Sequence, residues 1–433
     1  MLKGNIINKF EELSLSEPIL KAIEELNYTT PTAIQRKVIP IVNKKIDVIA
    51  ASKSGTGKTA AYILPMLHKI NGNLNYKHRV LRGLIIVPTR ELVEQVSKNL
   101  SELGRFLKVK HTKVMGGVSK SKQEEVLATG IDIVVATPGR LLDLDEQETI
   151  DLSSVNFVVL DEADTMLEMG FLKEIETIFS LCSPYRQIIM CSATISQNIR
   201  KLAKEFLKDP VTVQIHDRRD KVEMIEHQAY KVDVKKKKEL VATLVKESGY
   251  NQVLMFINKK DSADLASKYF EDQGIKTATI HGGIEYKDRV QAIKDFKSAK
   301  VKLLIATDIA ARGIDIKQLP LVINYTLPES TDDFTHRVGR TGRAGNDGKV
   351  ITILTVEDYN SFTKIERNLK LSVKRYIHDD FPLKDRQPRQ KIQKKKKLSE
   401  KKGKTTGSKE PVKTGAKSKK TTKRDAKRSF RRS

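Results

Sequence analysis

Short runs of apolar, often β-branched residues alternate along this chain with longer stretches in which apolar residues recur at helical spacing. This alternation is typical of β–α–β units, which build parallel sheets with helices on their faces. The runs in the first half are "DVIAAS", "LRGLIIVPT", "IDIVVATPG", "NFVVLDEAD" and "QIIMCSAT". A second series follows with "NQVLMFINK", "TATIHGG", "VKLLIATD", "LVINYTL" and "KVITILT". We therefore expect an α/β protein with two domains of similar size, each built on a parallel sheet.

Two breaks in this pattern set the predicted domain boundaries. A charged stretch at 209–225 predicts a linker between a first domain at 1–208 and a second domain at 226–383. From 384 to 433 the chain consists mainly of Lys, Ser, Thr and Gly. Such a segment has too little apolar surface to offset the loss of chain entropy on folding, so we expect a disordered tail.

Most of the positive charge lies in this tail. The chain has a net charge of +26, and residues 384–433 hold 22 Lys and Arg against 4 Asp and Glu, which is +18 of that total and leaves +8 for the rest. A polycation of this kind indicates a polyanionic partner, either nucleic acid or an anionic membrane surface. Phe430 is the tail's one aromatic residue, so the tail can attract phosphates but has little with which to stack bases. A solvated run that only aids solubility is the alternative.

Hydrophobicity and cysteine usage bear on the compartment. No apolar run reaches the roughly 18 to 20 residues needed to span a bilayer, and the N-terminus lacks the apolar core of a signal peptide. Cys182 and Cys191 have neither a metal-binding spacing nor a neighbouring His, and Cys191 lies in an apolar run that predicts a buried free thiol. We expect a soluble, cytoplasmic monomer with no membrane partner.

A glycine-rich segment between a predicted strand and a predicted helix indicates a phosphate-binding loop. The segment "SKSGTGKT" consists of Ser52, Lys53, Ser54, Gly55, Thr56, Gly57, Lys58 and Thr59. Its glycines let backbone N–H groups converge on phosphate oxygens, the Lys58 ammonium adds a positive charge, and the Thr59 hydroxyl is a candidate Mg²⁺ ligand. Ser52 stands where the general pattern has glycine. A loop that only caps the following helix is the alternative.

The acidic segment "VVLDEAD" supplies the residues that a nucleotide site needs opposite this loop. Asp161 follows a strand and can hold Mg²⁺ through its water shell, while Glu162 can orient and deprotonate an attacking water. Carboxylates after a strand can also simply face the dipole of a helix N-terminus. Their combination with Lys58 favours a site that hydrolyses a nucleoside triphosphate.

The tetrapeptide "DEAD" at 161–164, together with the loop, resembles the DEAD-box family of ATP-dependent RNA helicases, in superfamily 2. The resemblance spans roughly residues 10–375. It implies two tandem RecA-like domains, ATP and Mg²⁺ as cofactors, RNA-stimulated ATP hydrolysis, and RNA as a partner bound with little sequence preference. Its Q motif resembles "NYTTPTAIQ", in which the Gln35 amide can match adenine, and Phe10 stands at the distance of the family's upstream aromatic. Tyr28 replaces the family's more usual Phe.

Further motifs imply an RNA-binding surface and a coupling between sites. "PTREL", "GG" at 116 and 117, and "TPGR" resemble RNA-facing motifs of the first domain, and "ATDIAARGID" resembles motif V of the second. The residues that these motifs place against RNA are Thr89, Arg90, Gly117, Thr137, Arg140, Thr307 and Gly313. Any one of these motifs alone could be an ordinary turn. "SAT" resembles the segment that contacts the DEAD motif and couples the sites, and this coupling implies roles for Asp164, Ser192 and Thr194.

Residues of the second domain are implied to complete the ATP site. Asp315 lies near the nucleotide ribose in the family's arrangement. "HRVGRTGRAG" resembles motif VI, which makes Arg340 and Arg343 arginine fingers for the γ-phosphate and leaves His336 and Arg337 to tie this motif to the first domain.

Other interpretations remain open at this point. A DNA helicase of the same superfamily would share the ATP site, and a non-enzymatic RNA chaperone would act through the basic tail. The lysine-rich C-terminus resembles bacterial RhlE-type helicases, which implies ribosomal precursor particles or the RNA-decay machinery as partners. The cluster "KKTTKRDAKR" could also serve as a nuclear signal in a eukaryote.

Overall fold

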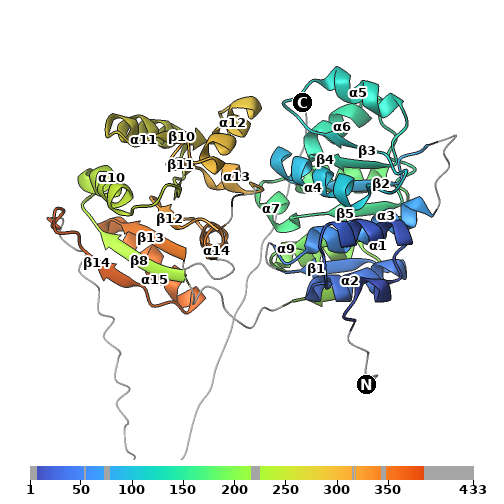
Figure 1. The fold of residues 1–433 in the computed structure, drawn as a ribbon, viewed down its shortest axis with the longest axis horizontal. Helices are drawn as coiled ribbons and strands as arrows, with labels where there is room; N and C mark the ends of the chain where they lie inside the picture. Colours follow the sequence, from blue (N-terminus) through green and yellow to red (C-terminus); the bar gives the residue numbers. More distant parts are fainter. Residues whose placement is uncertain are drawn as a thin grey trace, which may run out of the picture. The chain divides into compact units, whose positions relative to one another are not determined.

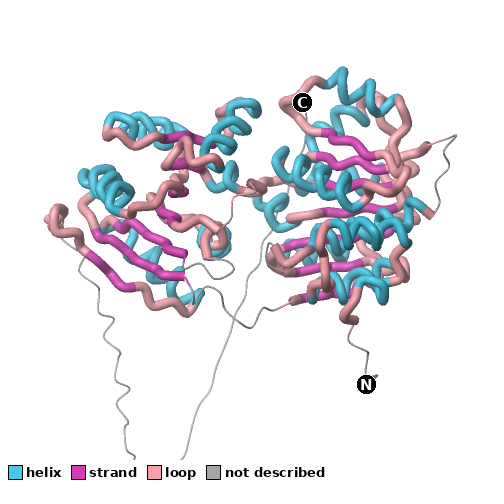
Figure 2. The backbone as a smooth tube through the Cα atoms, viewed as in Figure 1, coloured by secondary structure: helices cyan, strands magenta, loops and turns pink. Residues whose placement is uncertain are grey.

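Two parallel sheets of seven strands, each flanked by helices, make up the computed structural model (Figures 1 and 2). The structure describes residues 7–52, 55–72, 79–215, 225–314, 316, 318–342 and 348–384, all within a compact unit that spans 1–387. This architecture confirms the predicted fold of two tandem RecA-like α/β domains. Apart from Lys384, the predicted tail lies outside the described residues.

The first sheet has the strand order β3-β4-β2-β5-β6-β1-β7. Its strands are β1 (Val48–Ala51), β2 (Gly83–Ile86), β3 (His111–Val114), β4 (Ile133–Ala136), β5 (Phe157–Leu160), β6 (Gln187–Ser192) and β7 (Val211–Gln214). The helical elements of this domain are η1 (Phe10–Leu13), α1 (Glu17–Glu25), α2 (Ala33–Asn43), α3 (Lys58–Asn71), α4 (Arg90–Leu103), α5 (Lys120–Ala128), α6 (Pro138–Asp145), α7 (Ala163–Glu168), α8 (Leu172–Leu181) and α9 (Gln197–Phe206).

The second sheet repeats this order with β10-β11-β9-β12-β13-β8-β14, so each strand has its counterpart seven strands earlier. Its strands are β8 (Ile225–Lys231), β9 (Val253–Phe256), β10 (Thr277–Ile280), β11 (Leu303–Ala306), β12 (Leu321–Asn324), β13 (Gly348–Leu354) and β14 (Lys374–Tyr376). The helical elements are η2 (Val234–Lys236), α10 (Lys237–Glu247), α11 (Lys260–Asp272), α12 (Tyr286–Lys297), α13 (Asp308–Ala311), α14 (Thr331–Val338), η3 (Val356–Asp358) and α15 (Tyr359–Leu369). The two domains are thus built on one topology used twice.

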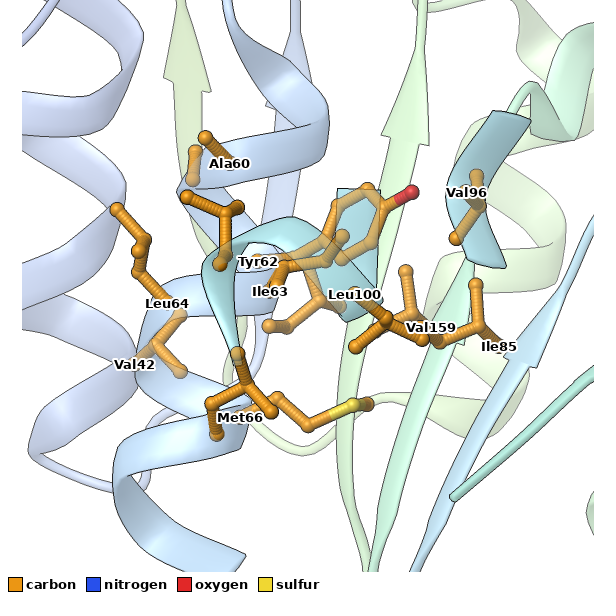
Figure 3. Close-up of a cluster of buried hydrophobic side chains, with 14 of the residues drawn as sticks. Val42, Ala60, Tyr62, Ile63, Leu64, Met66, Ile85, Val96, Leu100 and Val159 are labelled. Carbon is orange, nitrogen blue, oxygen red and sulfur yellow. The ribbon is translucent and has the colours of Figure 1, made fainter. Parts of the chain in front are cut away.

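Each central strand is buried on both faces and serves two hydrophobic clusters. In β2, Ile85 packs into the cluster under α3 and α4, whereas Leu84 and Ile86 pack into the cluster on the opposite face. Figure 3 shows part of the first cluster, in which Tyr62 of α3 lies among Leu100, Val159 and other apolar side chains. Strands buried on both faces read as continuous apolar runs, which is why these central strands are apparent in the sequence.

The structure assigns part of the predicted linker, 209–225, to the first sheet. Residues 211–214 form β7, which pairs in parallel with β1 through Val48↔Val211 and its neighbours. Val213 is its one buried residue, because an edge strand packs on one side only. The charged surroundings of this short strand concealed it in the sequence.

Two expectations about single features can also be compared with the structure. Cys182 and Cys191 are both free and buried, which confirms the predicted buried thiol at Cys191. Within the described ranges, no helix combines the length and apolar character that crossing a membrane requires.

Candidate functional site

The glycine-rich loop joins β1 to α3, and its end is held by tight packing. Gly57 precedes α3 with φ of +95°, and a Cβ at this position would lie 2.6 Å from Nε2 of Gln35. No other residue therefore fits there without strain. Ser52 is buried, with its Oγ 2.7 Å from Oγ1 of Thr56, and its carbonyl accepts a hydrogen bond from the Lys58 ammonium. Lys53 and Ser54 lie outside the described residues.

Gln35 connects the predicted adenine site to this loop. Its Oε1 accepts a hydrogen bond from the Thr32 amide at 2.8 Å, and its Nε2 donates to the Gly57 carbonyl at 3.1 Å. The first bond is half of a capping box at the start of α2. Gln35 is thus hydrogen-bonded to the loop, and its amide keeps one donor and one acceptor site that can bind a ligand.

Asp161 and Glu162 follow β5 at the end of the strand that faces the loop. Asp161 is buried, and its Oδ2 accepts a hydrogen bond from Oη of Tyr62 at 2.9 Å while its Oδ1 accepts one from the Glu162 amide at 2.9 Å. Burial raises the pKa of Asp161, and the Lys58 charge opposes that shift. Glu162 has φ of +54°, which is uncommon for a residue with a side chain and typical of functional positions.

The protonation of Glu162 is tuned by this environment. Burial and the neighbouring Asp161 carboxylate raise the pKa of Glu162 to about 7, although the charges of Arg340 and Lys58 oppose them. A carboxyl group with a pKa near neutrality can both take up and release a proton at physiological pH. This is the property expected of a general base.

These groups line one cavity of about 500 Å³, a size typical of small-ligand sites. Of the residues predicted from the sequence to bind nucleotide or act on it, the cavity brings together Phe10, Tyr28, Gln35, Gly55, Gly57, Lys58, Thr59, Asp161, Glu162 and Arg340. It also includes Gly313, which was predicted to face RNA. Arg340 and Gly313 come from the second domain, and all the others come from the first. Asp315 and Arg343 lie outside the described residues.

Thr59 and Asp161 are the candidate metal ligands in this cavity. Among the described residues, no group of three or more His, Cys, Asp or Glu side chains is placed to hold an ion. One hydroxyl and one carboxylate fit Mg²⁺, which proteins commonly hold through one or two side chains together with substrate phosphates. A cation that binds without a nucleotide, such as structural zinc, does not fit this set of donors.

The DEAD segment is bound to the "SAT" segment as the sequence led us to expect. Oδ2 of Asp164 accepts hydrogen bonds from the Ala193 amide at 2.9 Å and from the Thr194 amide at 3.0 Å. Oγ of Ser192 donates to the Thr194 carbonyl at 2.6 Å, which closes the turn. His336 lines a small cavity with Asp164, and burial lowers the pKa of this histidine while the Asp164 charge opposes the shift.

Arg337 departs from its expected place. We predicted that it ties motif VI to the first domain, yet its side chain is 1% exposed and its hydrogen bonds are all to second-domain groups. Its guanidinium donates to both carboxylate oxygens of Asp308 at 2.6 Å, to Oδ1 of Asn258 at 2.9 Å and to the Thr326 carbonyl at 2.6 Å. A buried guanidinium needs a partner for each donor, and residues that follow β9, β11 and β12 supply them. Arg337 therefore anchors α14 to its own sheet.

Arg340 lies three positions after Arg337 in the sequence, but its contacts are different. Its Nη1 donates to the Ile314 carbonyl at 2.7 Å. It also lines the small cavity with Lys58 and Glu162, and its charge lowers the pKa of Glu162. The structure thus brings this arginine to the loop and the acidic pair, which lie far from it in the sequence.

Four of the predicted RNA-facing residues gather at the start of α4. Thr89 caps α4 by accepting a hydrogen bond from the Leu92 amide, and a Cβ at Gly313 would overlap its hydroxyl. The Arg90 guanidinium lies so close to Gly117 that a Cβ there would overlap it as well. Both glycines also have positive φ, a backbone conformation that is strained for any other residue. Glycine is therefore required at each position for two reasons, the lack of space for a Cβ and the backbone conformation.

Three further predicted RNA-facing residues lie at comparable positions. Thr137 precedes α6 and Thr307 precedes α13, each in extended conformation at the end of a strand. Nη1 of Arg140 donates to the Val118 carbonyl at 3.4 Å, and its Nε lies 3.7 Å from Oδ2 of Asp143. Like Arg90, Arg140 lies near the "GG" segment.

Several contacts between side chains of the two domains were not apparent in the sequence. Nη2 of Arg312 lies 2.7 Å from Oε2 of Glu168, and Nη2 of Arg289 lies 2.9 Å from Oε1 of Glu91. Arg312 lies in the segment "ATDIAARGID" and Glu91 lies in "PTREL", so membership of these motifs was the sequence feature that could have indicated a role for either residue. No pattern pointed to Arg289.

Comparisons with known proteins agree with this site. A DEAD/DEAH box helicase family model matches residues 32–202, and a helicase conserved C-terminal domain model matches residues 235–345. The chain is 35% identical to the ATP-dependent RNA helicase DbpA of Bacillus subtilis over 85% of its length and 76% of that protein. It is 37% identical to a probable ATP-dependent RNA helicase of Methanocaldococcus jannaschii over 84% of its length and 97% of that protein.

A solved structure gives the same result at the level of the fold. The chain resembles Saccharomyces cerevisiae Dbp5 bound to RNA and ADP BeF3 with a TM-score of 0.76 and 28% identity, over 86% of this chain and 96% of that one. The residues in the cavity, the repeated sheet topology and the identity to relatives matched over most of their length lead to one conclusion. The chain belongs to the DEAD-box family of ATP-dependent RNA helicases.

Proposed function

We propose that the chain uses Mg²⁺·ATP, bound mainly by its first domain, to close both domains on RNA and separate short duplexes or remodel RNA–protein complexes. The observation that supports this most directly is the position of Arg340. This second-domain side chain lines a cavity together with Lys58 and Glu162 of the first domain. A site assembled from two domains is complete only while they are together, so hydrolysis depends on their closure.

The side chains of the cavity divide the chemistry between them. The loop amides and Lys58 bind the phosphates, and Thr59 with Asp161 holds Mg²⁺, which neutralises charge on the phosphate oxygens. Glu162 takes the proton of the attacking water, since its pKa of about 7 suits that exchange. Arg340 and Arg343 stabilise the negative charge that develops on the transferred phosphoryl group. Arginine fingers contribute about 10³- to 10⁵-fold in rate in phosphoryl-transfer enzymes.

RNA is proposed to bind across both domains along the predicted contact residues. Threonine hydroxyls, glycine amides and the guanidiniums of Arg90 and Arg140 recognise sugar and phosphate rather than base edges. Low sequence specificity follows from such contacts. Dbp5, the structural neighbour described above, was solved with RNA and ADP BeF3, which supports a shared RNA and nucleotide arrangement.

The finer parts of the function are proposed on less direct grounds. We infer a cytoplasmic monomer that acts in ribosome assembly or RNA decay, with a first domain that ends after β7, a linker between β7 and β8, and a second domain that runs from β8 to 383. The strongly basic segment 384–433 supports an interaction with large, structured RNA.

The test is to measure ATP hydrolysis and duplex separation by the full chain with RNA and with DNA of the same sequence. We expect RNA, but not DNA, to raise the ATPase rate. Glu162→Gln should remove hydrolysis and ATP-driven duplex turnover, while Glu125→Gln, an exposed position on α5, should leave both unchanged. Equal stimulation by DNA would favour a DNA helicase, and undiminished remodelling by Glu162→Gln would favour a chaperone that acts without ATP.

A further inference from the structure

A buried tyrosine on α3 contacts the acidic pair from inside the core. Tyr62 is fully buried, and its ring packs among the apolar side chains of Figure 3. Its Oη donates a hydrogen bond of 2.9 Å to Oδ2 of Asp161. Thr59 and Tyr62 stand three positions apart on α3, so they share one face of the helix. The hydroxyl therefore contacts one candidate Mg²⁺ ligand and lies on the helix face that carries the other.

In the hydrogen bond between Tyr62 and Asp161, the hydroxyl is the donor and the carboxylate is the acceptor. A phenolic hydroxyl keeps its proton near neutral pH, so Tyr62 donates and Asp161 accepts. The Glu162 amide donates to the other carboxylate oxygen, Oδ1, at 2.9 Å. Two donors held by the backbone and by a packed ring leave the Asp161 carboxylate one orientation. A buried carboxylate that lost one of these donors would keep its desolvation cost without the compensating bond.

We propose that Tyr62 is a positioning residue, which orients the Asp161 carboxylate toward the Mg²⁺ of the bound nucleotide. This inference rests on the proposed function. Groups that hydrogen-bond to metal ligands fix the orientation of those ligands, and their loss typically lowers metal affinity or activity about 10- to 100-fold. Tyr62 meets this description without lining the nucleotide cavity itself.

The decisive variant is Tyr62→Phe in the full chain, since phenylalanine keeps the ring and removes only the hydroxyl. Binding of a fluorescent N-methylanthraniloyl ADP is titrated against Mg²⁺ and, separately, measured in EDTA. We expect the Mg²⁺ concentration for half-maximal binding to rise about tenfold or more. Affinity in EDTA should stay within about twofold of the wild type, because the loop contacts are unchanged. Ile63→Val, which trims the same helix in the same cluster, controls for packing and should alter neither quantity.

A second variant separates a positioning role from a merely structural one. If Tyr62 acts through Asp161, the Tyr62→Phe effect on the Mg²⁺ titration should disappear in an Asp161→Asn background. An equal loss of affinity with and without Mg²⁺, or an unshifted Mg²⁺ titration in Tyr62→Phe, would overturn the inference. A wild-type chain whose nucleotide binding ignored Mg²⁺ would instead contradict the proposed function, so the two failures can be told apart.

Discussion

Gln35 uses half of its amide on the protein itself. Its bonds to the Thr32 amide and the Gly57 carbonyl leave one N–H donor and one lone pair for the edge of adenine. The residue that we propose to recognise the base is therefore also hydrogen-bonded to the glycine-rich loop. On this proposal, one side chain links adenine recognition to the conformation of the loop.

Gln35→Ala should accordingly weaken more than base selectivity. We expect nucleotide affinity to fall about tenfold or more, since a buried backbone carbonyl and the adenine edge both lose a partner. The preference for ATP over GTP should shrink in the same variant. Competition of both nucleotides against a fluorescent ADP measures the two effects. Gln273→Ala, exposed in the second domain, is the matched control. Unchanged affinity for both nucleotides would argue against any role for Gln35 at the site.

We propose that coupling between the domains depends on Arg340, which lines a cavity with Lys58 and Glu162. Arg340→Ala should reduce RNA-stimulated ATP hydrolysis by at least about 100-fold, because an arginine finger stabilises charge only in the transition state. ATP affinity should change by no more than about threefold, since the loop and Lys58 remain. Steady-state kinetics and equilibrium binding report the two quantities. Arg367→Ala, exposed on α15, serves as the control. A loss of both hydrolysis and binding would instead indicate a structural role, with the Ile314 carbonyl left without its donor.

Among single residues, the sequence predicts those that belong to a recognisable local motif. Lys58, Asp161 and Glu162 follow strands at recognisable spacing, and they meet in the cavity. Tyr62 and Arg337 could not be placed in that way, because their partners are distant in sequence and their contacts depend on packing. Arg337 shows this, since its motif suggested a link between the two domains, whereas its buried N–H groups donate to acceptors of the second domain.

Among the elements, the strands that the sequence pattern did not predict lie at or beside sheet edges. The pattern predicts five strands in each domain, and the structure adds β3 and β7 to the first sheet and β8 and β14 to the second. All four are partly exposed. Edge strands bury fewer side chains, so they need not form apolar runs and their composition resembles that of loops.

The last of these strands is held by a side-chain pair that offers a test of stability. Arg375 of β14 donates to Oε1 of Glu366 at 2.7 Å and to Oε2 at 2.5 Å, and the Val373 amide donates to Oε1 at 3.0 Å. Burial by itself would raise the pKa of Glu366, but these hydrogen bonds and the Arg375 charge outweigh it and lower the pKa. The pair thus joins β14 to α15.

Glu366→Gln should lower the free energy of unfolding of the second domain by about 1 kcal/mol at pH 7. A carboxyl group whose pKa is lower in the folded state stabilises the fold above its unfolded pKa and loses that contribution as the pH falls through its folded pKa. The difference between the variant and the wild type should therefore narrow as the pH drops from 7 toward 4 and below. Urea unfolding at several pH values measures it, with Glu329→Gln as an exposed control. A difference that did not depend on pH would exclude the proposed charge effect.

For the whole molecule, one topology used twice explains why distant residues meet. In both sheets the functional segments follow the carboxyl ends of parallel strands, which is where ligands bind in open α/β folds. Lys58 and Asp161 stand at this edge of the first sheet, and the Gly313 and Arg340 segments come from the second domain. The sequence predicts the two sheets and their shared edge, but contacts such as Glu168 with Arg312 require the folded geometry.

The basic segment 384–433 allows a test of RNA binding by the whole chain, because no residue of the nucleotide cavity belongs to this segment. If it tethers the enzyme to RNA, its deletion should weaken RNA binding and flatten the dependence of log K on log salt. Each phosphate neutralised on single-stranded RNA contributes about 0.7 to that slope, so losing five such contacts would reduce it by about 3.5. Fluorescence anisotropy at a series of salt concentrations measures this.

A control must separate charge from chain length. A variant that carries a Gly/Ser segment of equal length in place of 384–433 should behave like the deletion, because flexible uncharged linkers bind no phosphate. ATP affinity should match the wild type in both variants, since no cavity residue is removed. If RNA affinity at low salt were the same with and without the segment, its 22 basic residues would serve solubility alone. The sugar-phosphate contacts of the two domains would then account for all RNA binding.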